Sequence, residues 1–466
     1  MITIKVYRKK VEICVLSAVG VAFKELKIKE DVVLRGATFK RGIHPCDKKS
    51  LSKEKKIERL PVPPELVVPL SQHIGAPASA VVGRGDRVEK GQLIASPSSF
   101  VSAAVHSPVS GIVKEIRKTV ICNGAVCDAV VIESDSEQRE LYNERFEWKD
   151  MTAEELAAAV RDNGIVGMGG ATFPTSVKFA VNGRRVEYLV INAVECEPYL
   201  TCDYRLMMER PEAIIEGTMI AARILKPENI IIAVEENKED AALLLEKTAQ
   251  KMGAEITVAL MKMKYPQGDE KQLLYALTKR AVPSGKLPLD IGCIVCNTAS
   301  VNAIFEAVVY HKPLIERVVT VSGECIKEPK NLIVPFGTPF RRLFEYCSGV
   351  EEDGAEFMAG GPMMGFDLSS LDIPTVKGNN GLVCLKRQKE SPVFPCMHCG
   401  KCAQHCPMGL TPNNMYRLIT NAHYQEAMDI GLMDCKECGC CAYSCPSHLN
   451  LVQAFRLGKK MGRKAK

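Results

Sequence analysis

The sequence predicts a multidomain α/β protein with a β-rich N-terminal region and a helical C-terminal domain. Three observations predict it. At 466 residues the chain is too long for a single hydrophobic core. Residues 186–194 and 229–235 are near-continuous apolar runs separated by helical patterns, as strands of a parallel sheet covered on both faces require. Close to the C-terminus, eight cysteines form two copies of one spaced run among helical segments.

Residues 1–38 are interpreted as a leader of unknown role. The apolar residues 11–23 follow three basic residues, as in a signal peptide, but they contain Glu12 and are too few to cross a bilayer. We therefore expect a loosely ordered or edge-strand leader. The polar, Lys- and Pro-rich residues 46–65 indicate a linker or loop. No other stretch could cross a membrane, so we expect membrane contact only through partners.

Residues 39–135 are predicted to form a domain of short strands. Apolar residues alternate over 67–96 and 100–116 and are interrupted by Gly and Pro turns. This region resembles the barrel-sandwich hybrid of biotinyl and lipoyl carrier domains. Phe100 stands where such a domain carries its modified lysine, so no amine is available for biotin or lipoate. A carrier function is therefore disfavoured.

Residues 151–312 are predicted to form a Rossmann-like α/β domain, with helices over 211–226 and 239–253. A Gly-rich loop opens it at residues 164–174. Glycines let backbone N–H groups approach a phosphate, and we expect a helix from Thr175 to present its positive end there. A tight structural loop is an equally good interpretation of this motif taken alone.

Polar side chains follow the predicted strands of this domain. Asn192 and two glutamates come at the end of the strand over 186–194, where α/β folds place ligand-binding groups. Asp269 and Glu270 form an acidic pair at a helix start, and Asn297 with Thr298 follows a later apolar strand. These segments strengthen the phosphate-site interpretation.

Two regions complete the chain. Residues 315–380 have short strands with Gly and Pro turns, which suits a small α+β module. Residues 386–458 contain two Cys-x-x-Cys-x-x-Cys-x-x-x-Cys-Pro runs, the pattern of two-cluster [4Fe–4S] proteins, in which the fourth cysteine of each run binds the other cluster. We assign cluster 1 to Cys396, Cys399, Cys402 and Cys445, and cluster 2 to Cys435, Cys438, Cys441 and Cys406. Structural zinc is the alternative, but it usually uses two separated Cys-x-x-Cys pairs.

Composition limits the function further. With eight of twenty cysteines in the two runs and a large chain, a reducing cytosolic setting fits better than a disulfide scaffold. The net charge is only +6, with one Trp and no basic–aromatic stripe, so nucleic-acid binding has little support.

Several motifs in order resemble the flavin subunit of respiratory complex I, and nearly everything after residue 38 resembles the C subunit of the Rnf complex. Rnf is the ion-translocating ferredoxin:NAD oxidoreductase. The matching motifs are GIHP (42–45), QHIGAP (72–77), NAVECEPYLTCDYRLM (192–207), YPQGDEKQLLYALT (265–278), VPSGKLP (282–288), AGGPMMG (359–365) and both cysteine runs. The resemblance implies that residues 315–380 are a β-grasp (SLBB) module.

The resemblance also implies site residues. It gives the FMN phosphate and ribityl region to Gly167, Gly169, Gly170 and Lys178, and further flavin or phosphate hydrogen bonds to Asn192, Glu195, Asp269, Glu270, Asn297 and Thr298. It gives the nicotinamide nucleotide to Phe173, by stacking, and to Glu197, by hydrogen bonding. Two positions depart from the complex I pattern. Val194 replaces an acidic residue, and Met168 replaces an arginine and so removes a cation from the phosphate loop.

The function implied is electron transfer. NAD(H) and FMN would exchange hydride, and two [4Fe–4S] clusters would pass single electrons to or from other Rnf subunits, including the ferredoxin-like and integral membrane subunits. The chain would lie peripherally on the cytoplasmic face of the bacterial inner membrane, while Na⁺ or H⁺ moves elsewhere in the complex. Two alternatives remain: a flavin and iron–sulfur cobalamin reductase, and a wiring subunit that has lost its flavin.

Overall fold

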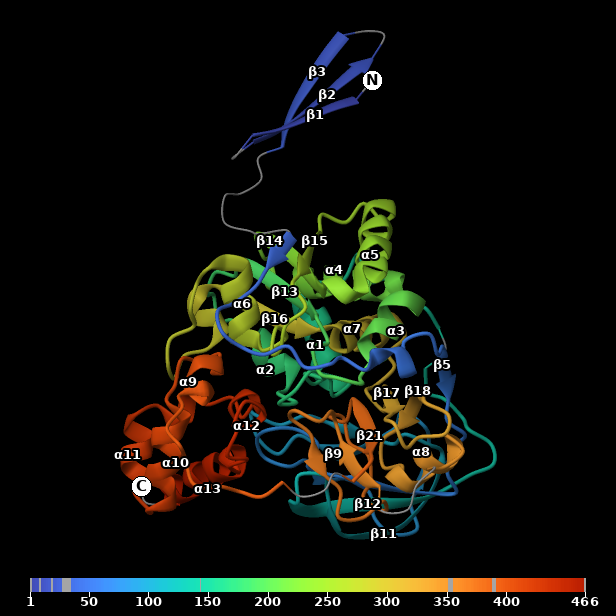
Figure 1. The fold of residues 1–466 in the computed structure, drawn as a ribbon. Coiled ribbons are helices and arrows are strands. Elements are labelled where there is room, and N and C mark those ends of the chain that lie inside the picture. Colours follow the sequence, from blue (N-terminus) through green and yellow to red (C-terminus); the bar gives the residue numbers. More distant parts are fainter. Residues whose placement is uncertain are drawn as a thin grey trace.

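The predicted parallel sheet forms the upper body of the molecule in Figure 1. The structure is a computed structural model that describes residues 35–142, 144–350, 355–387 and 391–464, and the backbone of three strands within residues 2–26. These three strands pair into an antiparallel sheet: β1 (Ile2–Tyr7), β2 (Lys10–Ser17) and β3 (Gly20–Leu26). The rest of the predicted leader up to residue 34 lies outside the described residues.

Five parallel strands form the sheet of the α/β domain. In spatial order they are β16 (Cys293–Asn297), β13 (Tyr188–Ala193), β14 (Asn229–Glu235), β15 (Thr257–Met261) and β4 (Arg35–Ala37). The predicted strands over 186–194 and 229–235 are confirmed as β13 and β14. Successive side chains of a strand point to opposite faces, and here both faces are buried in separate apolar cores. This is why the two runs are apolar at nearly every position.

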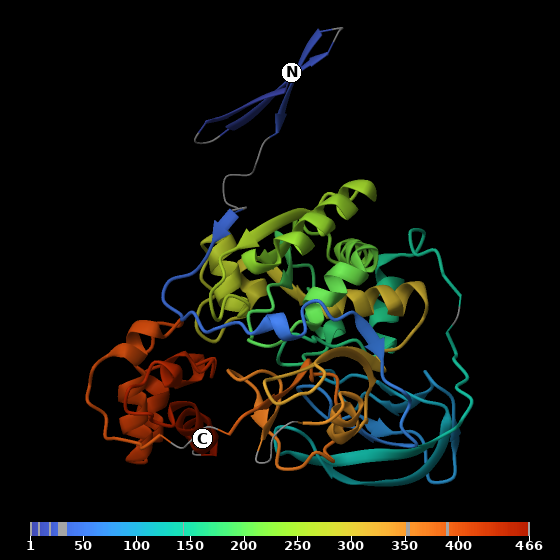
Figure 2. The ribbon, with the colours of Figure 1, turned by 45° about the vertical axis from the view of Figure 1, so that its right-hand side comes forward.

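Helices cover both faces of this sheet (Figures 1 and 2). One core contains residues of α1 (Ala153–Asp162), α3 (Cys202–Glu209), α4 (Pro211–Leu225), α5 (Glu239–Lys251) and α7 (Thr298–Val309), and the end of the short α2 (Thr175–Phe179). The other contains residues of α6 (Glu270–Thr278). Helices α4 and α7 pack closely because Gly217 has no side chain. A Cβ at this position would lie only 2.0 Å from the Val301 carbonyl oxygen.

The barrel-sandwich hybrid lies below the α/β domain in Figure 1. One of its sheets has the order β10-β9-β7 and the other β6-β12-β11-β8. The strands are β6 (Glu65–Pro69), β7 (Ser79–Ala80), β8 (Arg87–Val88), β9 (Leu93–Ser96), β10 (Val105–His106), β11 (Gly111–Val120) and β12 (Val126–Ser134). Phe100 is 74% exposed, so a hydrophobic side chain stands in solvent where a carrier domain would present its lysine.

The β-grasp module contains a six-stranded mixed sheet of order β20-β19-β21-β17-β18-β5. Its elements are β17 (Glu316–Ser322), β18 (Lys330–Pro335), α8 (Phe340–Tyr346), β19 (Glu356–Ala359), β20 (Phe366–Asp367) and β21 (Gly381–Leu385), with β5 (Ile57–Arg59) at the edge. The C-terminal region is helical, as predicted, with α9 (Lys401–His405), α10 (Pro412–Thr420), α11 (Tyr424–Asp429), α12 (Cys440–Tyr443) and α13 (Leu451–Lys464) around a core of its own.

Residues 35–60, here called the crossing segment, join two domains before the sandwich begins. Its first strand, β4, extends the α/β sheet, and its last, β5, pairs in parallel with β18 of the β-grasp sheet. Between them Ile43 forms an antiparallel bridge with Tyr265, and Lys49 is buried. Much of the stretch predicted as a linker over 46–65 is therefore built into the fold.

Candidate functional site

Three of the predicted residues meet at the carboxyl ends of β13 and β16. Asn192 and Asn297 are paired in register across the two strands. The Asn192 amide donates to the Gly268 carbonyl oxygen at 2.8 Å, and the Thr298 hydroxyl donates to the Asn192 carbonyl oxygen at 3.1 Å. Asn297 caps α7 by accepting the N–H of Ala299 at 2.9 Å. These bonds fix the polar groups at the edge of the sheet.

The Gly-rich loop lies against this edge. Its ends are closed by a bridge between Val166 and Pro174 and by the Gly167 N–H, which donates to the Phe173 carbonyl oxygen at 2.9 Å. A Cβ at Gly169 would lie 2.8 Å from the Asn297 Cβ, so a side chain there would displace a predicted site residue. Gly169 and Gly170 are exposed, and none of the described residues accepts a hydrogen bond from their N–H groups. Such groups can bind a phosphate.

Lys178 and Glu270 face each other beside the loop. The Lys178 ammonium donates to the Val295 carbonyl oxygen at 2.8 Å and lies 3.8 Å from the Glu270 carboxylate. Asp269 caps α6 by accepting the N–H of Gln272 at 3.1 Å. The helix expected from Thr175 is α2, which has only five residues, so its terminal field is small. Phe173 is half-buried.

Glu195 lies beneath the sheet edge in a strained position. Its φ is 46°, its side chain is 3% exposed, and one carboxylate oxygen accepts the Asp203 N–H at 2.7 Å. Its other oxygen has no hydrogen-bond partner and lies 3.9 Å from the Lys49 ammonium. Burial raises the pKa of Glu195 to about 7.

The Glu197 side chain contacts the β-grasp module. Its carboxylate accepts the N–H groups of Met363 at 2.6 Å and Met364 at 3.1 Å. A Cβ at Gly361 would lie 2.1 Å from the Glu197 Cγ, so the AGGPMMG turn wraps this side chain closely. Burial nevertheless raises the pKa of Glu197. The structure therefore gives Glu197 partners in the β-grasp module.

Sequence reasoning missed two charged groups here. Asp203 is buried and accepts the Asn297 amide N–H at 2.7 Å, while its second oxygen has no hydrogen-bond partner. Lys49 donates to the carbonyl oxygens of Glu197 at 2.8 Å and Leu200 at 2.5 Å. Asp203 lies within the motif over 192–207, which could have indicated it as a site residue. Lys49 lies within the stretch interpreted as a linker, so no sequence signal indicated it.

The two departures from the complex I pattern are both buried. Val194 packs in the core shared with α6, and Met168 is 3% exposed. Neither presents a polar group to the sheet edge. The unpartnered oxygens of Glu195 and Asp203, and the open N–H groups of Gly169 and Gly170, nevertheless leave hydrogen-bonding capacity that fits a polar flavin nucleotide.

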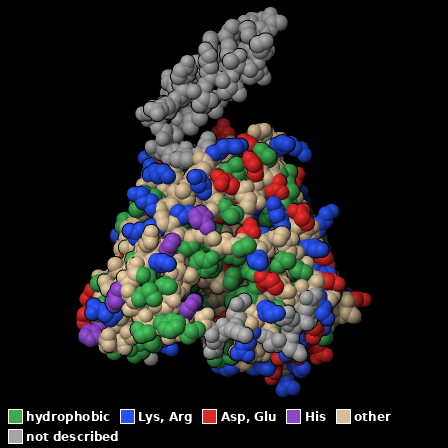
Figure 3. All heavy atoms as spheres, in the orientation of Figure 1, with side chains coloured by type: hydrophobic (Ala, Val, Ile, Leu, Met, Phe, Trp, Pro, Cys, Tyr) green, Lys and Arg blue, Asp and Glu red, His purple; other side chains and the backbone are tan. Residues whose placement is uncertain are grey.

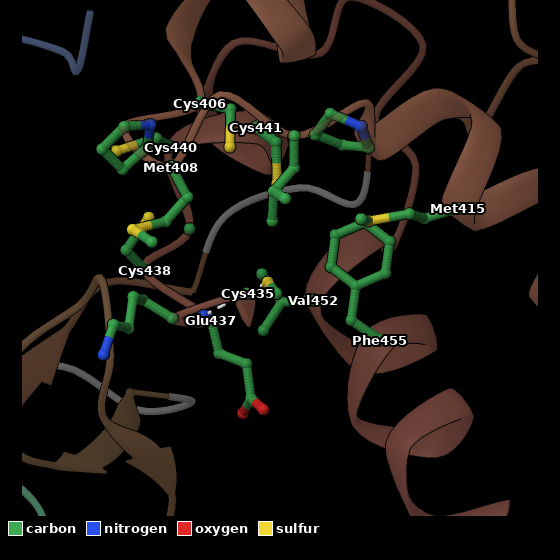
Figure 4. Close-up of a pocket in the computed structure, with 15 residues that line it drawn as sticks. Cys406, Met408, Met415, Cys435, Glu437, Cys438, Cys440, Cys441, Val452 and Phe455 are labelled. Atoms are coloured by element: carbon green, nitrogen blue, oxygen red, sulfur yellow. Dashed lines mark hydrogen bonds between the residues drawn. The ribbon is translucent and has the colours of Figure 1, made fainter. Parts of the chain in front are cut away.

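The cysteines assigned to cluster 2 line one pocket. Figure 4 shows the side chains of Cys406, Cys435, Cys438 and Cys441 around a shared space, together with Cys440. Three come from the second run and one from the first. Leu410, Met415, Val452 and Phe455 add an apolar lining.

The cysteines assigned to cluster 1 line a second pocket. They are Cys396, Cys399, Cys402 and Cys445, again three from one run and one from the other. Within the described residues, no group of three or more His, Cys, Asp or Glu side chains is arranged to hold a single metal ion.

The pocket of the cluster 2 cysteines touches the turn and the helix α6 that follow β15. The Cys440 sulfur lies 4.0 Å from the Tyr265 carbonyl oxygen, and the Gln272 amide nitrogen lies 3.2 Å from the Met408 sulfur. Tyr265, Cys438 and Cys440 share a small apolar core with Ile43 of the crossing segment. We call this pocket the near pocket and the other the far pocket.

Comparison with known families follows the same four domains. Family descriptions match residues 37–137 (RnfC barrel sandwich hybrid domain), 160–306 (Nuo51 FMN-binding domain), 318–367 (SLBB domain) and 392–446 (4Fe-4S dicluster domain). The chain is 42% identical to the C subunit of the proton-translocating ferredoxin:NAD(+) oxidoreductase complex of Clostridium ljungdahlii, over 84% of this chain and 86% of that protein. The chain belongs to the RnfC family.

Other members of the RnfC family are similar to this chain over most of its length. The C subunit of the ion-translocating oxidoreductase complex of Rhodobacter capsulatus is 41% identical over 91% of this chain and 83% of its own length. The C subunit of the Na(+)-translocating ferredoxin:NAD(+) oxidoreductase complex of Acetobacterium woodii is 38% identical over 92% and 97%. The chain is thus the C subunit of an ion-translocating ferredoxin:NAD⁺ oxidoreductase, with FMN-binding and 4Fe-4S dicluster domains. The predicted fold class and the Rnf resemblance are confirmed.

Proposed function

We propose that this subunit exchanges hydride with NAD(H) through FMN at the carboxyl end of the parallel sheet, and passes single electrons through two [4Fe–4S] clusters. One observation supports it above the others: the near pocket packs directly against the turn at residues 265–272 that carries part of the predicted flavin site. A short separation between flavin and cluster is what electron transfer between them needs.

The flavin-holding residues have separate tasks in this proposal. Gly167, Gly169, Gly170 and Lys178 bind the phosphate and ribityl region, the glycines by backbone N–H groups and the lysine by its charge. Asn192, Glu195, Asp269, Glu270, Asn297 and Thr298 supply hydrogen bonds around it. When bound, FMN takes a hydride from a nicotinamide and gives up electrons singly, which an iron–sulfur cluster can accept.

The nucleotide-binding residues are Phe173 and Glu197. Phe173 is half-buried at the end of the Gly-rich loop, where its ring can stack on a planar base or ring. Glu197 already accepts two backbone N–H groups, so a nucleotide would use its remaining acceptor positions. This makes Glu197 also a link between nucleotide binding and the AGGPMMG turn.

The near pocket receives electrons first and the far pocket second. Cys399 and Met397 at the far pocket are exposed, and Figure 3 shows hydrophobic side chains gathered over the helical region that contains both pockets. Exposed apolar surface of this kind marks a docking site. We propose that other Rnf subunits dock there and hold the chain peripherally at the cytoplasmic face of the bacterial inner membrane. Across the described residues, no helix is long and apolar enough to cross a membrane.

The test is anaerobic reconstitution of the purified full chain with iron, sulfide and FMN. We expect about eight irons per chain and bleaching of both flavin and cluster absorbance on addition of NADH. If NADH bleaches neither, the nucleotide assignment is wrong. Clusters that load without any flavin spectrum would instead support the wiring subunit that has lost its flavin.

A further inference from the structure

Two buried cations from the β-grasp module hold the rear of the Gly-rich loop. The Arg317 guanidinium, in β17, donates to the Met168 carbonyl oxygen at 3.2 Å and to the Lys377 carbonyl oxygen at 2.6 Å. The Lys377 ammonium donates to the carbonyl oxygens of Gly164 and Ala104, both at 2.8 Å. Both side chains are buried. The β-grasp module thus fastens both the start and the middle of the loop.

Arg317 and Lys377 donate their hydrogen bonds mainly to backbone carbonyl oxygens, and the Cys202 thiol also lies beside Arg317. Among the described residues, no carboxylate accepts a hydrogen bond from Arg317 or Lys377. Asp203 lies close enough to interact electrostatically with Arg317, but its bonded oxygen accepts from Asn297. Burial lowers the pKa of both cations, and that of Lys377 to about 7, whereas a guanidinium stays charged. A buried charge without a paired carboxylate is costly, so it calls for a functional reason.

The Arg317 bond also sets which way the loop's N–H groups point. In a trans peptide the C=O and the following N–H point in opposite directions. Because the Met168 carbonyl points back to Arg317, the N–H of Gly169 points to the front of the loop. There Gly169 is exposed, and none of the described residues accepts its hydrogen bond.

Two glycines show how closely the supporting modules approach. A Cβ at Gly164, whose φ is 65°, would lie 2.3 Å from the Ala104 carbonyl oxygen of the sandwich. A Cβ at Gly378 would lie 2.9 Å from the Thr172 Cγ2 in the loop. The sandwich and the β-grasp module therefore form the wall behind the loop.

We propose that Arg317 is a positioning residue for the phosphate of the flavin, supplying from the β-grasp module the positive charge that the loop itself lacks at Met168. Lys377 supports it by anchoring the loop's first glycine. The inference rests on the proposed function, since it takes the FMN phosphate to bind at Gly169 and Gly170. It also gives the β-grasp module a task that needs no ligand of its own.

The test compares binding of FMN with binding of riboflavin, which lacks the phosphate, on the full chain with reconstituted clusters. The ratio of the two dissociation constants, measured by flavin fluorescence quenching, does not depend on the folded fraction of a sample. We expect Arg317→Met to reduce the preference for FMN over riboflavin about tenfold, mostly by raising the dissociation constant of FMN. We also expect FMN binding to depend less on salt concentration. Arg317→Lys keeps a charge without the two-pronged fork, so we expect a smaller loss.

Lys330→Met is the matched control, because Lys330 is a cation of the same module that pairs with Glu58 and Glu328 instead of the loop. We expect it to keep the wild-type ratio. If the wild-type chain prefers FMN and both Arg317 variants keep that preference, the inference is overturned while the proposed function stands. If the wild-type chain binds neither flavin, the proposed function itself fails and takes the inference with it. Should Arg317→Met not fold, Arg317→Lys decides the question.

Discussion

The near and far pockets have the same cysteine spacing but different surroundings. In the near pocket Cys406, Cys438 and Cys441 are each 8% exposed, and the pocket packs against Tyr265 in the turn that follows β15. In the far pocket Cys399 is exposed and Met397 is 60% exposed. Local spacing therefore decides that four sulfurs converge, while tertiary contacts decide whether a pocket faces the flavin domain or the outside. Solvent exposure and nearby hydrogen bonds also set cluster potentials, so the two clusters should differ.

The largest effect should come from removing one ligand in each pocket. Cys438→Ala and Cys399→Ala should each lose about four of about eight irons. In the Cys399 variant NADH should still reduce the remaining near cluster, because that cluster borders the flavin domain. In the Cys438 variant the far cluster should respond to dithionite but much more slowly to NADH. Iron analysis and electron paramagnetic resonance after each reductant measure this, and equal NADH responses would contradict the order of the pockets.

Weakening FMN binding should reduce the response of both clusters to NADH together. In Gly169→Ala the new Cβ would lie 2.8 Å from the Asn297 Cβ, so the loop and the sheet edge must separate. We expect FMN affinity to fall by at least about tenfold and NADH reduction of both clusters to fall with it. Dithionite should still reduce both.

Gly83→Ala is the matched control for this change. Its Cβ would meet nothing closer than the Asp86 carboxylate at 3.9 Å, and Gly83 lies in the sandwich region. It should bind FMN like the wild type. Wild-type FMN affinity in the Gly169 variant would show that the flavin does not use this loop.

A smaller effect should separate the potentials of the two clusters. The Lys459 ammonium donates to the Cys435 carbonyl oxygen at 2.7 Å and pairs with Glu437 at the near pocket. Lys459→Met removes this positive charge, so the near cluster should shift to a lower potential by tens of millivolts, on the order seen for outer-shell changes. The far cluster should not shift. Lys460→Met, an exposed neighbour in α13, is the control in the same redox titration.

The smallest effect is a pH dependence of stability that comes from Glu195 at the predicted flavin site. The pKa of Glu195 is raised to about 7 from its ordinary value of 4.5, so between these values the unfolded state has lost a proton that the folded state keeps. Wild-type stability should therefore fall as pH rises from about 4.5 to 7, by at most about 3 kcal/mol. Glu195→Gln removes this loss, so its thermal midpoint relative to wild type should rise over that window. A constant difference would contradict the assigned pKa.

The sequence predicted the parts of this molecule that depend on local pattern. The cysteine spacing indicated which sulfurs would share a pocket, and continuous apolar runs indicated β13 and β14, because both signals lie within a few residues. Lys49, Arg317 and Lys377 could not be predicted. Each is a single cation in an ordinary stretch, and only tertiary packing buries it against carbonyl groups. Glu197 shows the opposite case: its motif was visible, but its partners Met363 and Met364 come more than a hundred residues later.

The crossing segment has a consequence for how the chain is made. Arg35 of β4 pairs with Leu260 of β15. Strand β4 therefore leaves the ribosome early but cannot pair until a strand more than two hundred residues later has been synthesised. The pairing of β5 with β18 spans a still longer stretch of sequence. The α/β and β-grasp sheets are therefore completed only late in translation, and a truncated version starting at the sandwich would lack an edge strand in both.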